Sequence, residues 1–180
     1  MKDLVGVFLM RWRIRVVLDT LQGDILDVGC GTNELVKTYK TLHPECKAVG
    51  VDVHPWEGVD MVIEQTDHLP FADASFDTVC CIAALNHIPE REEFLQDAKR
   101  ILRPRGRLVL TMLPPGISRV WHALRAPWDA DQHKRGMAAG EVYGLNADIV
   151  KSLLKTAGFS VPRVNSFMLG INKLYVAEKI

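Results

Sequence analysis

Residues 25–34 read ILDVGCGTNE, and this stretch decides the fold class of the chain. The aliphatic and β-branched run Ile25–Val28 has the composition of a buried strand. Gly29 and Gly31 then break the strand with a turn, where the absence of side chains lets the backbone approach a ligand closely. A helix-compatible stretch follows and stops before Pro44. A strand, a glycine turn and a helix in this order predict the first unit of an α/β fold.

The alternation of strands and helices continues along the chain. Further strands are expected at Ala48–Asp52, Met61–Ile63, Thr78–Ile82, Arg107–Met112, Val161–Met168 and Ile171–Glu178. Helices are expected at Phe8–Leu21, Glu34–Leu42 and Glu92–Leu102, and from an Asn146 cap through Thr156. Near-continuous apolar strands between helices indicate a parallel sheet with helices on both faces. Because only a tight turn at Gly170 separates the last two strands, the sequence predicts a doubly wound, seven-stranded α/β sheet, mostly parallel with an antiparallel last strand.

The composition bounds the domain organisation and the partners. With 180 residues the chain is expected to form one domain, 1–180, with an N-terminal helix within residues 1–22. Lys plus Arg and Asp plus Glu both number 22, so the formal net charge is zero and a nucleic-acid partner is disfavoured. No apolar run approaches a membrane span, and Arg11, Arg13 and Arg15 follow the apolar N-terminal stretch, unlike in a signal peptide. We expect a cytoplasmic protein in which these arginines form a solvated helix face.

The four cysteines predict thiols rather than a metal site or a disulfide framework. Cys30, Cys46, Cys80 and Cys81 show no C-x-x-C spacing. Cys80 and Cys81 are adjacent on an expected strand, so their side chains point to opposite faces and cannot hold a metal together. Buried, reduced thiols are typical of a reducing compartment.

The segment Pro114–Gly144 is expected to be an irregular insert, because strand and helix periodicity fail there. Unpatterned segments of this length in a compact domain are usually functional or disordered. The segment also follows an expected strand whose carboxyl end lies on the ligand side of the sheet. We therefore expect a lid over a substrate site, with His133 and Tyr143 as candidate substrate contacts.

Two patterns inside the insert leave alternatives open. Asp129, Asp131 and His133 form a D-x-D-x-H pattern that suits a metal or a polar substrate, but solvated lid residues are the favoured interpretation because irregular sequence does not fix ligand geometry. No metal is expected. The aromatic residues Trp121, Trp128 and Tyr143 either line a substrate pocket or pack over a sheet edge, and the sequence does not separate the two.

Acidic residues at two expected strand ends indicate a nucleoside site. Ligands of open α/β sheets bind outside the carboxyl ends of the strands. Asp52 ends the second strand, where its carboxylate can accept hydrogen bonds from both ribose hydroxyls. A dinucleotide is disfavoured, because Glu34 occupies the position of the last glycine of G-x-G-x-x-G. Asp27, beside the glycine turn, suits the ammonium group of an amino-acid tail.

Five motifs together resemble a known family. They read ILDVGCGTN, VGVDVHP, LPFADASFDTV, ALNHIPE and RILRPRGRLVLT, and they extend from Ile25 to about Met112 in the order and spacing of that family. The chain resembles class I S-adenosylmethionine-dependent methyltransferases, in particular the small type related to quinone-biosynthesis (methyltransferase type 11) enzymes. The resemblance implies a Rossmann-like fold and S-adenosyl-L-methionine as the cofactor.

The resemblance also implies roles for residues at the turn and the strand ends. Gly29, Cys30 and Gly31 would line the amino-acid and ribose portion of the cofactor, with Asp27 near its amino group and Asp52 on the ribose. Asn33 stands where the family has its third glycine, and it tolerates left-handed dihedral angles.

The adenine end and the methyl end follow from the same resemblance. Val53 would flank adenine. Gln65, followed by Thr66, stands where the family often has an acid that meets the adenine amino group, and Asp67 is an alternative acceptor. The segment Ala83–His87 resembles the one that passes beside the reactive methyl group.

His87 is the candidate catalytic residue, either as a general base or, as the sequence favours, as a residue that hydrogen-bonds backbone near the cofactor. We expect direct methyl transfer to a small-molecule acceptor, since the sulfonium is already activated. The alternative is a catalytically inactive S-adenosylmethionine-binding regulatory or partner module. The sequence names neither the acceptor atom nor the oligomeric state.

Overall fold

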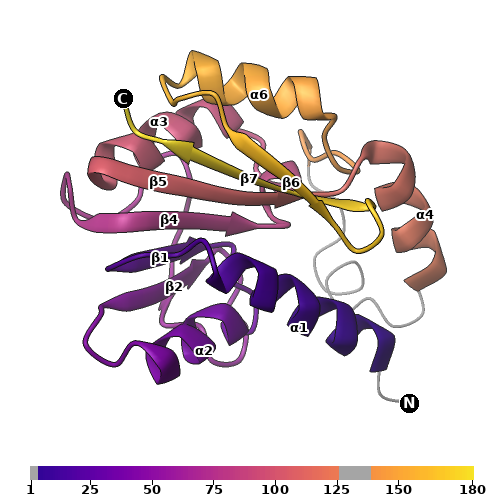
Figure 1. Ribbon diagram of the computed structural model, residues 1–180, viewed down its shortest axis with the longest axis horizontal. Coiled ribbons are helices and arrows are strands. Elements are labelled where there is room, and N and C mark those ends of the chain that lie inside the picture. Colours follow the sequence, from indigo (N-terminus) through magenta and orange to yellow (C-terminus); the bar gives the residue numbers. More distant parts are fainter. Residues whose placement is uncertain (1–3, 126–138) are drawn as a thin grey trace.

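The computed structural model describes residues 4–125 and 139–180, which form a seven-stranded sheet with helices on both faces (Figure 1). The strands lie in the order β3-β2-β1-β4-β5-β7-β6. Their bounds are Ile25–Val28 for β1, Ala48–Asp52 for β2, Met61–Val62 for β3, Phe76–Ile82 for β4, Leu102–Met112 for β5, Arg163–Phe167 for β6 and Asn172–Glu178 for β7. Neighbours from β3 to β5 are parallel, whereas β7 is antiparallel to β5 and β6. The predicted α/β architecture is confirmed.

The strand order reverses between β1 and β4. From β1 the chain builds outward through β2 and β3, and then returns to place β4 on the other side of β1. At such a switch point the connections leave toward opposite faces, so the carboxyl ends of the central strands border a crevice. The ends of β1, β2 and β4 therefore meet at one edge of the sheet.

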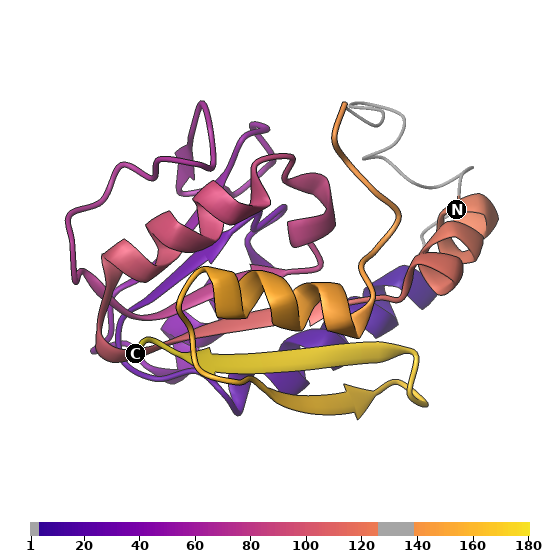
Figure 2. The same cartoon turned by 90° about the horizontal axis from the view of Figure 1, so that it is seen from above.

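Helices cover both faces of the sheet (Figures 1 and 2). One face carries α1, Leu4–Leu18, and α2, Glu34–Leu42; the other carries α3, Arg91–Ile101, and α6, Ala147–Thr156. Asn146 occupies the N-cap position of α6, as predicted, but its side chain makes no capping hydrogen bond. Cys80 belongs to the core under α1, and Cys81 to the opposite core with Phe94 and Leu154. The two adjacent thiols thus point to opposite faces, as predicted.

The first helix starts earlier than expected and is only partly covered. Ile14 and Val17 of α1 pack against the sheet. Phe8 and Trp12, two large apolar residues of α1, are 61% and 36% exposed. In Figure 1 the N-terminal half of α1 extends beyond the sheet.

The prediction of an irregular insert over Pro114–Gly144 is wrong for its first third, because Pro115–Arg125 form the helix α4. Proline is tolerated in the first turn of a helix, where its missing N–H needs no partner. Ile117 and Val120 follow at helical spacing. Because prolines and a glycine stand directly before them, this spacing did not predict a helix. Trp128, Asp129, Asp131 and His133 lie outside the described residues, as does the side chain of Trp121.

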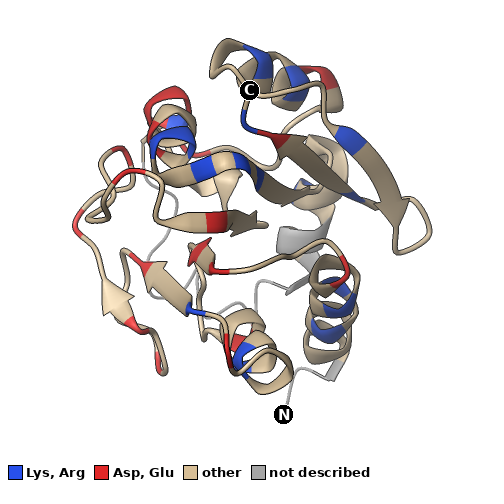
Figure 3. Cartoon of the chain, turned by 60° about the vertical axis from the view of Figure 1, so that its left-hand side comes forward, with Lys and Arg blue, Asp and Glu red and all other residues tan. Residues whose placement is uncertain are grey.

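Charged residues of both signs are spread over the fold, and those of α1 are all arginines (Figure 3). Arg11 and Arg15 are exposed, as predicted for a solvated face, but Arg13 is half-buried. Within residues 4–125 and 139–180 no helix has the length and apolar character needed to cross a membrane.

Candidate functional site

The turn after β1 has a backbone that ordinary residues rarely adopt. Gly29, Gly31 and Asn33 have φ angles of +74°, +53° and +64°. A Cβ at Gly29 would lie 2.6 Å from the Cβ of Ala84, so the turn packs tightly against the segment after β4. A Cβ at Gly31 would meet nothing within 4 Å. The turn is therefore closed on the Gly29 side and open to a ligand at Gly31.

The carboxylate of Asp52, at the end of β2, joins this turn to the second strand. Its Oδ2 accepts a hydrogen bond from the Gly31 N–H at 2.9 Å, and its Oδ1 accepts one from the His54 N–H at 3.0 Å. A carboxylate has about four lone-pair directions, so acceptor capacity remains for ribose hydroxyls. The two predicted strand-end features, the glycine turn and Asp52, are in direct contact.

Asp27 is the most unusual ionisable group at this edge. The residue is 3% exposed, and its Oδ1 has no hydrogen-bond partner within the described residues. Burial, and to a lesser degree the negative charge of Asp52, raises the pKa of the Asp27 carboxyl to about 8. A buried carboxyl without a donor is costly unless a cation pairs with it. The side chain therefore fits the ammonium group of an amino-acid ligand.

Cys30, between the two glycines, is half-buried. Burial and the neighbouring Asp27 and Asp52 raise the pKa of its thiol, so it remains protonated at neutral pH. Cys30 therefore lines the turn as a neutral thiol, and its raised pKa does not suit a nucleophile.

The side chain of Asn33 makes hydrogen bonds to the loop between β2 and β3. Its Nδ2 donates to the Gly58 carbonyl and to Asp60 Oδ2, both at 2.9 Å, and Asp60 also accepts from the Gly50 N–H at 2.9 Å. A Cβ at Gly50 would collide with the Asn33 amide, so only glycine fits there. The left-handed backbone expected of Asn33 is confirmed. Its contact with a cofactor stays a prediction.

Glu34, which the sequence used against a dinucleotide, pairs with Lys37 Nζ at 3.1 Å along the first turn of α2. Its charge is therefore partnered within the helix. The case against a pyrophosphate rests instead on Asp27 and Asp52, two acidic side chains beside the helix N-terminus where phosphates usually bind.

The expected adenine contacts follow β2 and β3. Val53 and Gln65 are exposed, whereas Thr66 and Asp67 are half-buried. Asp67 Oδ1 is buried, and none of the residues that the structure describes donates a hydrogen bond to it. This oxygen has the free acceptor capacity that an adenine amino group requires, which favours the alternative acceptor Asp67 over the exposed Gln65. The adenine contact itself stays a prediction.

The segment after β4 brings together two residues that are distant in sequence. Ala83 has a φ of +56°, a backbone conformation that is strained for residues other than glycine. The short 3-10 helix η1, Leu85–His87, follows it. His87 Nδ1 lies 3.1 Å from Glu141 Oε2. The Glu141 side chain is 1% exposed and that of His87 is 21% exposed, so a buried carboxylate orients an accessible imidazole.

Backbone contacts hold this pair in place. Asn86 and Val142 exchange hydrogen bonds, with Asn86 Nδ2 donating to the Val142 carbonyl at 3.1 Å and the Val142 N–H donating to the Asn86 carbonyl at 3.0 Å. Arg91 donates to the Gly140 carbonyl at 2.8 Å. Sequence analysis missed Glu141, because an acid 54 residues from its partner carries no local signal.

Of the two candidate substrate contacts, Tyr143 is described and His133 is not. Tyr143 is half-buried, with the guanidinium of Arg119 from α4 5.7 Å from its ring centroid. This cation–π contact ties the end of the insert to α4.

Comparison with known proteins agrees with this arrangement. Residues 26–110, nearly half of the chain, match the family described as a methyltransferase domain. The matched stretch contains most of β1, the glycine turn, Asp52 and most of β5. This match supports an S-adenosylmethionine-dependent methyltransferase that is similar to the class I enzymes. The cofactor of this methyltransferase is S-adenosylmethionine, and the buried, unpartnered Asp27 and the open turn at Gly31 fit its amino-acid tail and ribose.

Two curated relatives illustrate the similarity. The demethylmenaquinone methyltransferase of Thermotoga maritima is 25% identical over 177 residues, which cover 84% of this methyltransferase and 77% of the relative. The phthiotriol/phenolphthiotriol dimycocerosates methyltransferase 1 of Mycobacterium ulcerans is 30% identical over 145 residues, which cover 74% and 51% of the two chains. This methyltransferase thus spans about half to three quarters of the length of these relatives.

A solved structure shows the same fold. The S-adenosylmethionine-dependent methyltransferase from Aquifex aeolicus superimposes with a TM-score of 0.68 at 16% sequence identity, covering 93% of this chain and 89% of that one.

Proposed function

We propose that this chain transfers the methyl group of S-adenosylmethionine directly to a small-molecule acceptor. The observation that carries the proposal is the pair Asp27 and Asp52, one carboxyl buried without a donor and one fixed to the open turn at Gly31. When bound, the cofactor supplies a methyl group on a positively charged sulfur, which is already an activated electrophile. The protein then has to bind, orient and exclude water.

Each part of the crevice has a task in this proposal. Asp27 pairs with the ammonium group, and Asp52 accepts the ribose hydroxyls. The backbone of Gly29, Cys30, Asn33 and Ala83 shapes the space between these groups and the methyl group. Val53, Gln65, Thr66 and Asp67 border adenine, with Asp67 Oδ1 as the acceptor for its amino group.

The small-molecule acceptor is supported by the size of the chain and by the relatives. Besides the sheet and the helices α2, α3 and α6, the described residues offer α1, the segment near His87, α4 and the residues after α4 to build an acceptor site. Both curated relatives are named as methyltransferases of small molecules, demethylmenaquinone and phthiotriol/phenolphthiotriol dimycocerosates. A small acceptor suits a site of this size better than a macromolecule.

We include His87 in the proposal as the general base. Because Glu141 lies at Nδ1, we infer that the imidazole carries its proton on Nδ1, which leaves Nε2 unprotonated, as a general base requires. Glu141 acts through His87 and is a positioning residue. The pair is a reason to favour catalysis over an inactive binding module.

Calorimetry with S-adenosylmethionine, S-adenosylhomocysteine and NADH tests the cofactor part. We expect binding of both sulfur compounds and none of NADH. Tight NADH binding with silence toward both sulfur compounds would overturn the proposal. Metabolite fractions are then screened for S-adenosylhomocysteine formation, and an inactive module is the conclusion if the protein binds the cofactor but no fraction supports turnover.

The active fraction also tests the base. His87→Gln should lower kcat by about 10²-fold or more while leaving KM for the cofactor unchanged. Glu141→Gln should lower kcat less and displace the pH profile of kcat, a change that loss of structure alone does not produce. Full activity of His87→Gln would remove the histidine from the mechanism.

A further inference from the structure

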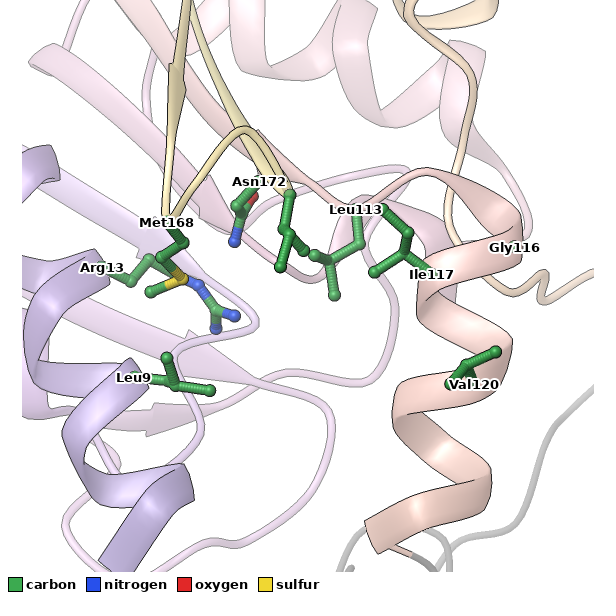
Figure 4. A pocket seen from close by; sticks show the side chains of 9 residues that line it. Leu9, Arg13, Leu113, Gly116, Ile117, Val120, Met168 and Asn172 are labelled. Atoms are coloured by element: carbon green, nitrogen blue, oxygen red, sulfur yellow. The ribbon is translucent and has the colours of Figure 1, made fainter.

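A second concave site lies beside the crevice, outside every residue assigned above. The cavity has a volume of about 350 Å³ and lies between α1, α4 and the turn that joins β6 to β7 (Figure 4). It is lined by Leu9, Arg13, Leu113, Gly116, Ile117, Val120, Met168, Ile171 and Asn172. Volumes of this order are typical of small-molecule sites.

The lining is apolar except at two places. Five aliphatic residues and a methionine provide most of the surface, and Ile117, Val120 and Ile171 are exposed at its rim. Arg13 is the charged residue of the lining, and in Figure 4 its side chain extends from α1 toward the cavity. An apolar skeleton fits this lining, whereas a cationic ligand meets a like charge.

Asn172 gives the cavity a specific polar group. The residue is fully buried at the start of β7, and neither its Nδ2 nor its Oδ1 has a hydrogen-bond partner in residues 4–125 or 139–180. Figure 4 shows its side chain directed into the cavity. A buried amide with both ends unpaired costs stability, and buried polar groups are normally hydrogen-bonded. The unpaired amide therefore points to a ligand that completes it.

The cavity adjoins the end of the crevice where the methyl group is expected. The Ala83 N–H donates to the Thr111 carbonyl at 3.2 Å, which joins the segment after β4 to the end of β5. Thr111 is two residues before Leu113 of the lining. Its Oγ1 is also buried and lacks a partner among the described residues. Thr111 pairs in register with Leu174, so it shares a sheet face with Asn172.

We propose that this cavity binds the methyl acceptor, an apolar molecule with a carbonyl or hydroxyl oxygen that hydrogen-bonds to the Asn172 amide. The proposal rests on the proposed function and adds the acceptor class and the residue that recognises it. Asn172 Nδ2 donates to the oxygen, and the aliphatic walls hold the skeleton. Amines that are protonated at neutral pH are disfavoured, because the apolar lining does not replace their hydration.

Three probes of one bicyclic shape separate these contributions: indan-1-one with a carbonyl, indane without it and 1-aminoindane with a cationic group. Titrations are followed by the backbone amide NMR signals of the lining residues and, in the parent, also by those of the Asn172 side-chain amide. We expect indan-1-one to bind about three- to tenfold more tightly than indane, as one neutral hydrogen bond predicts. 1-Aminoindane should bind most weakly.

Variants locate the binding. Asn172→Leu and Asn172→Ala should abolish the preference for indan-1-one over indane, and Ile117→Trp should weaken both probes by filling the cavity. Ile149→Trp, at an exposed isoleucine of α6 away from the cavity, is the matched control and should change nothing. Thermal unfolding verifies that each variant is folded.

The proposal is overturned if the parent binds neither probe, if both Asn172 variants keep the preference, or if Ile117→Trp binds like the control. Probe binding needs no cofactor, so its failure is distinct from a failure to bind S-adenosylmethionine. If the probes bind as expected and S-adenosylmethionine does not, the cavity is a ligand site but the proposed function is lost.

Discussion

Replacing Asp27 by Asn tests the central electrostatic feature of the site. In the free protein, burial raises the pKa of the Asp27 carboxyl to about 8, so at about pH 7 it is about nine-tenths protonated. Pairing with an ammonium group requires the ionised form. Binding of S-adenosylmethionine should therefore release about 0.9 proton at about pH 7, which costs about 1.4 kcal/mol of affinity.

The same shift predicts the pH dependence of affinity and stability. Between about pH 5 and 7 the dissociation constant of S-adenosylmethionine should fall about tenfold per pH unit, because each unit lowers the free-energy cost of deprotonating Asp27. A folded pKa above the unfolded value of 3.8 contributes stability that is complete below pH 3.8 and is lost as the pH rises through about 8. For a fully buried carboxyl, the loss in the free energy of unfolding is on the order of 5 kcal/mol, which is an upper bound. Asp27→Asn should remove both dependences and bind the cofactor at least about tenfold more weakly.

Calorimetry in two buffers with different ionisation enthalpies counts the released protons, and urea unfolding across the pH range gives the stability. Asp19→Asn, at an exposed aspartate in the turn after α1, is the control and should behave like the parent. Proton release that survives in Asp27→Asn, or a parent affinity that does not vary with pH, would refute the pairing of Asp27 with the ammonium group.

Two further substitutions test neighbouring parts of the fold. Asp52→Ala removes the acceptor for the Gly31 N–H and for the ribose. Calorimetry should therefore show at least a tenfold loss of cofactor affinity with the fold intact. Unchanged affinity would mean that the ribose does not bind to Asp52. Arg100→Ala removes the arginine that pairs with Asp97, whose side chain is 8% exposed, and urea unfolding should show a loss of about 3 kcal/mol. Adding Asp97→Asn, which removes the charge but keeps an acceptor for the Leu69 N–H, should recover much of that loss, and no recovery would mean that packing rather than charge is responsible.

The parts of the structure that the sequence predicted are those specified locally. The strand β1, the helix α2 and the strand β2 are each bounded by glycine, proline or polar residues a few positions away, and their observed bounds agree with the predicted ones. Asp52 was predicted at the crevice because parallel strands bring their carboxyl ends to one edge, whatever the detail of packing.

The parts that were missed depend on contacts between distant segments. Helical spacing identifies the apolar side of α1, but it does not say where the sheet ends, and so Phe8 and Trp12 are exposed. The approach of Glu141 to His87 requires the residues after α4 to return over η1. The absence of a donor for Asp27 is a property of the whole neighbourhood and has no pattern in sequence.

The distribution of unpartnered polar groups provides independent support for where ligands bind. Several buried polar side chains away from the crevice are satisfied, although Arg107 Nε is an exception: Thr78 bonds with the backbone of Gln22, and Asp97 accepts from the Leu69 N–H and from Arg100. Unsatisfied ones in the described chain include Asp27 in β1, Asp67 after β3, Thr111 near the end of β5 and Asn172 at the start of β7. Because β7 is antiparallel, its start lies at the same edge as the carboxyl ends of the other strands.

A chain that only had to fold would gain stability by making such groups apolar, since an unpaired buried polar atom costs about 1–3 kcal/mol. Their gathering at one edge is expected if two ligands complete them. The cofactor would satisfy Asp27 and Asp67, and the acceptor would satisfy Asn172, on the two sides of β4. The methyl group would then pass between these sites beside Ala83, whose strained backbone and hydrogen bond to Thr111 join one site to the other.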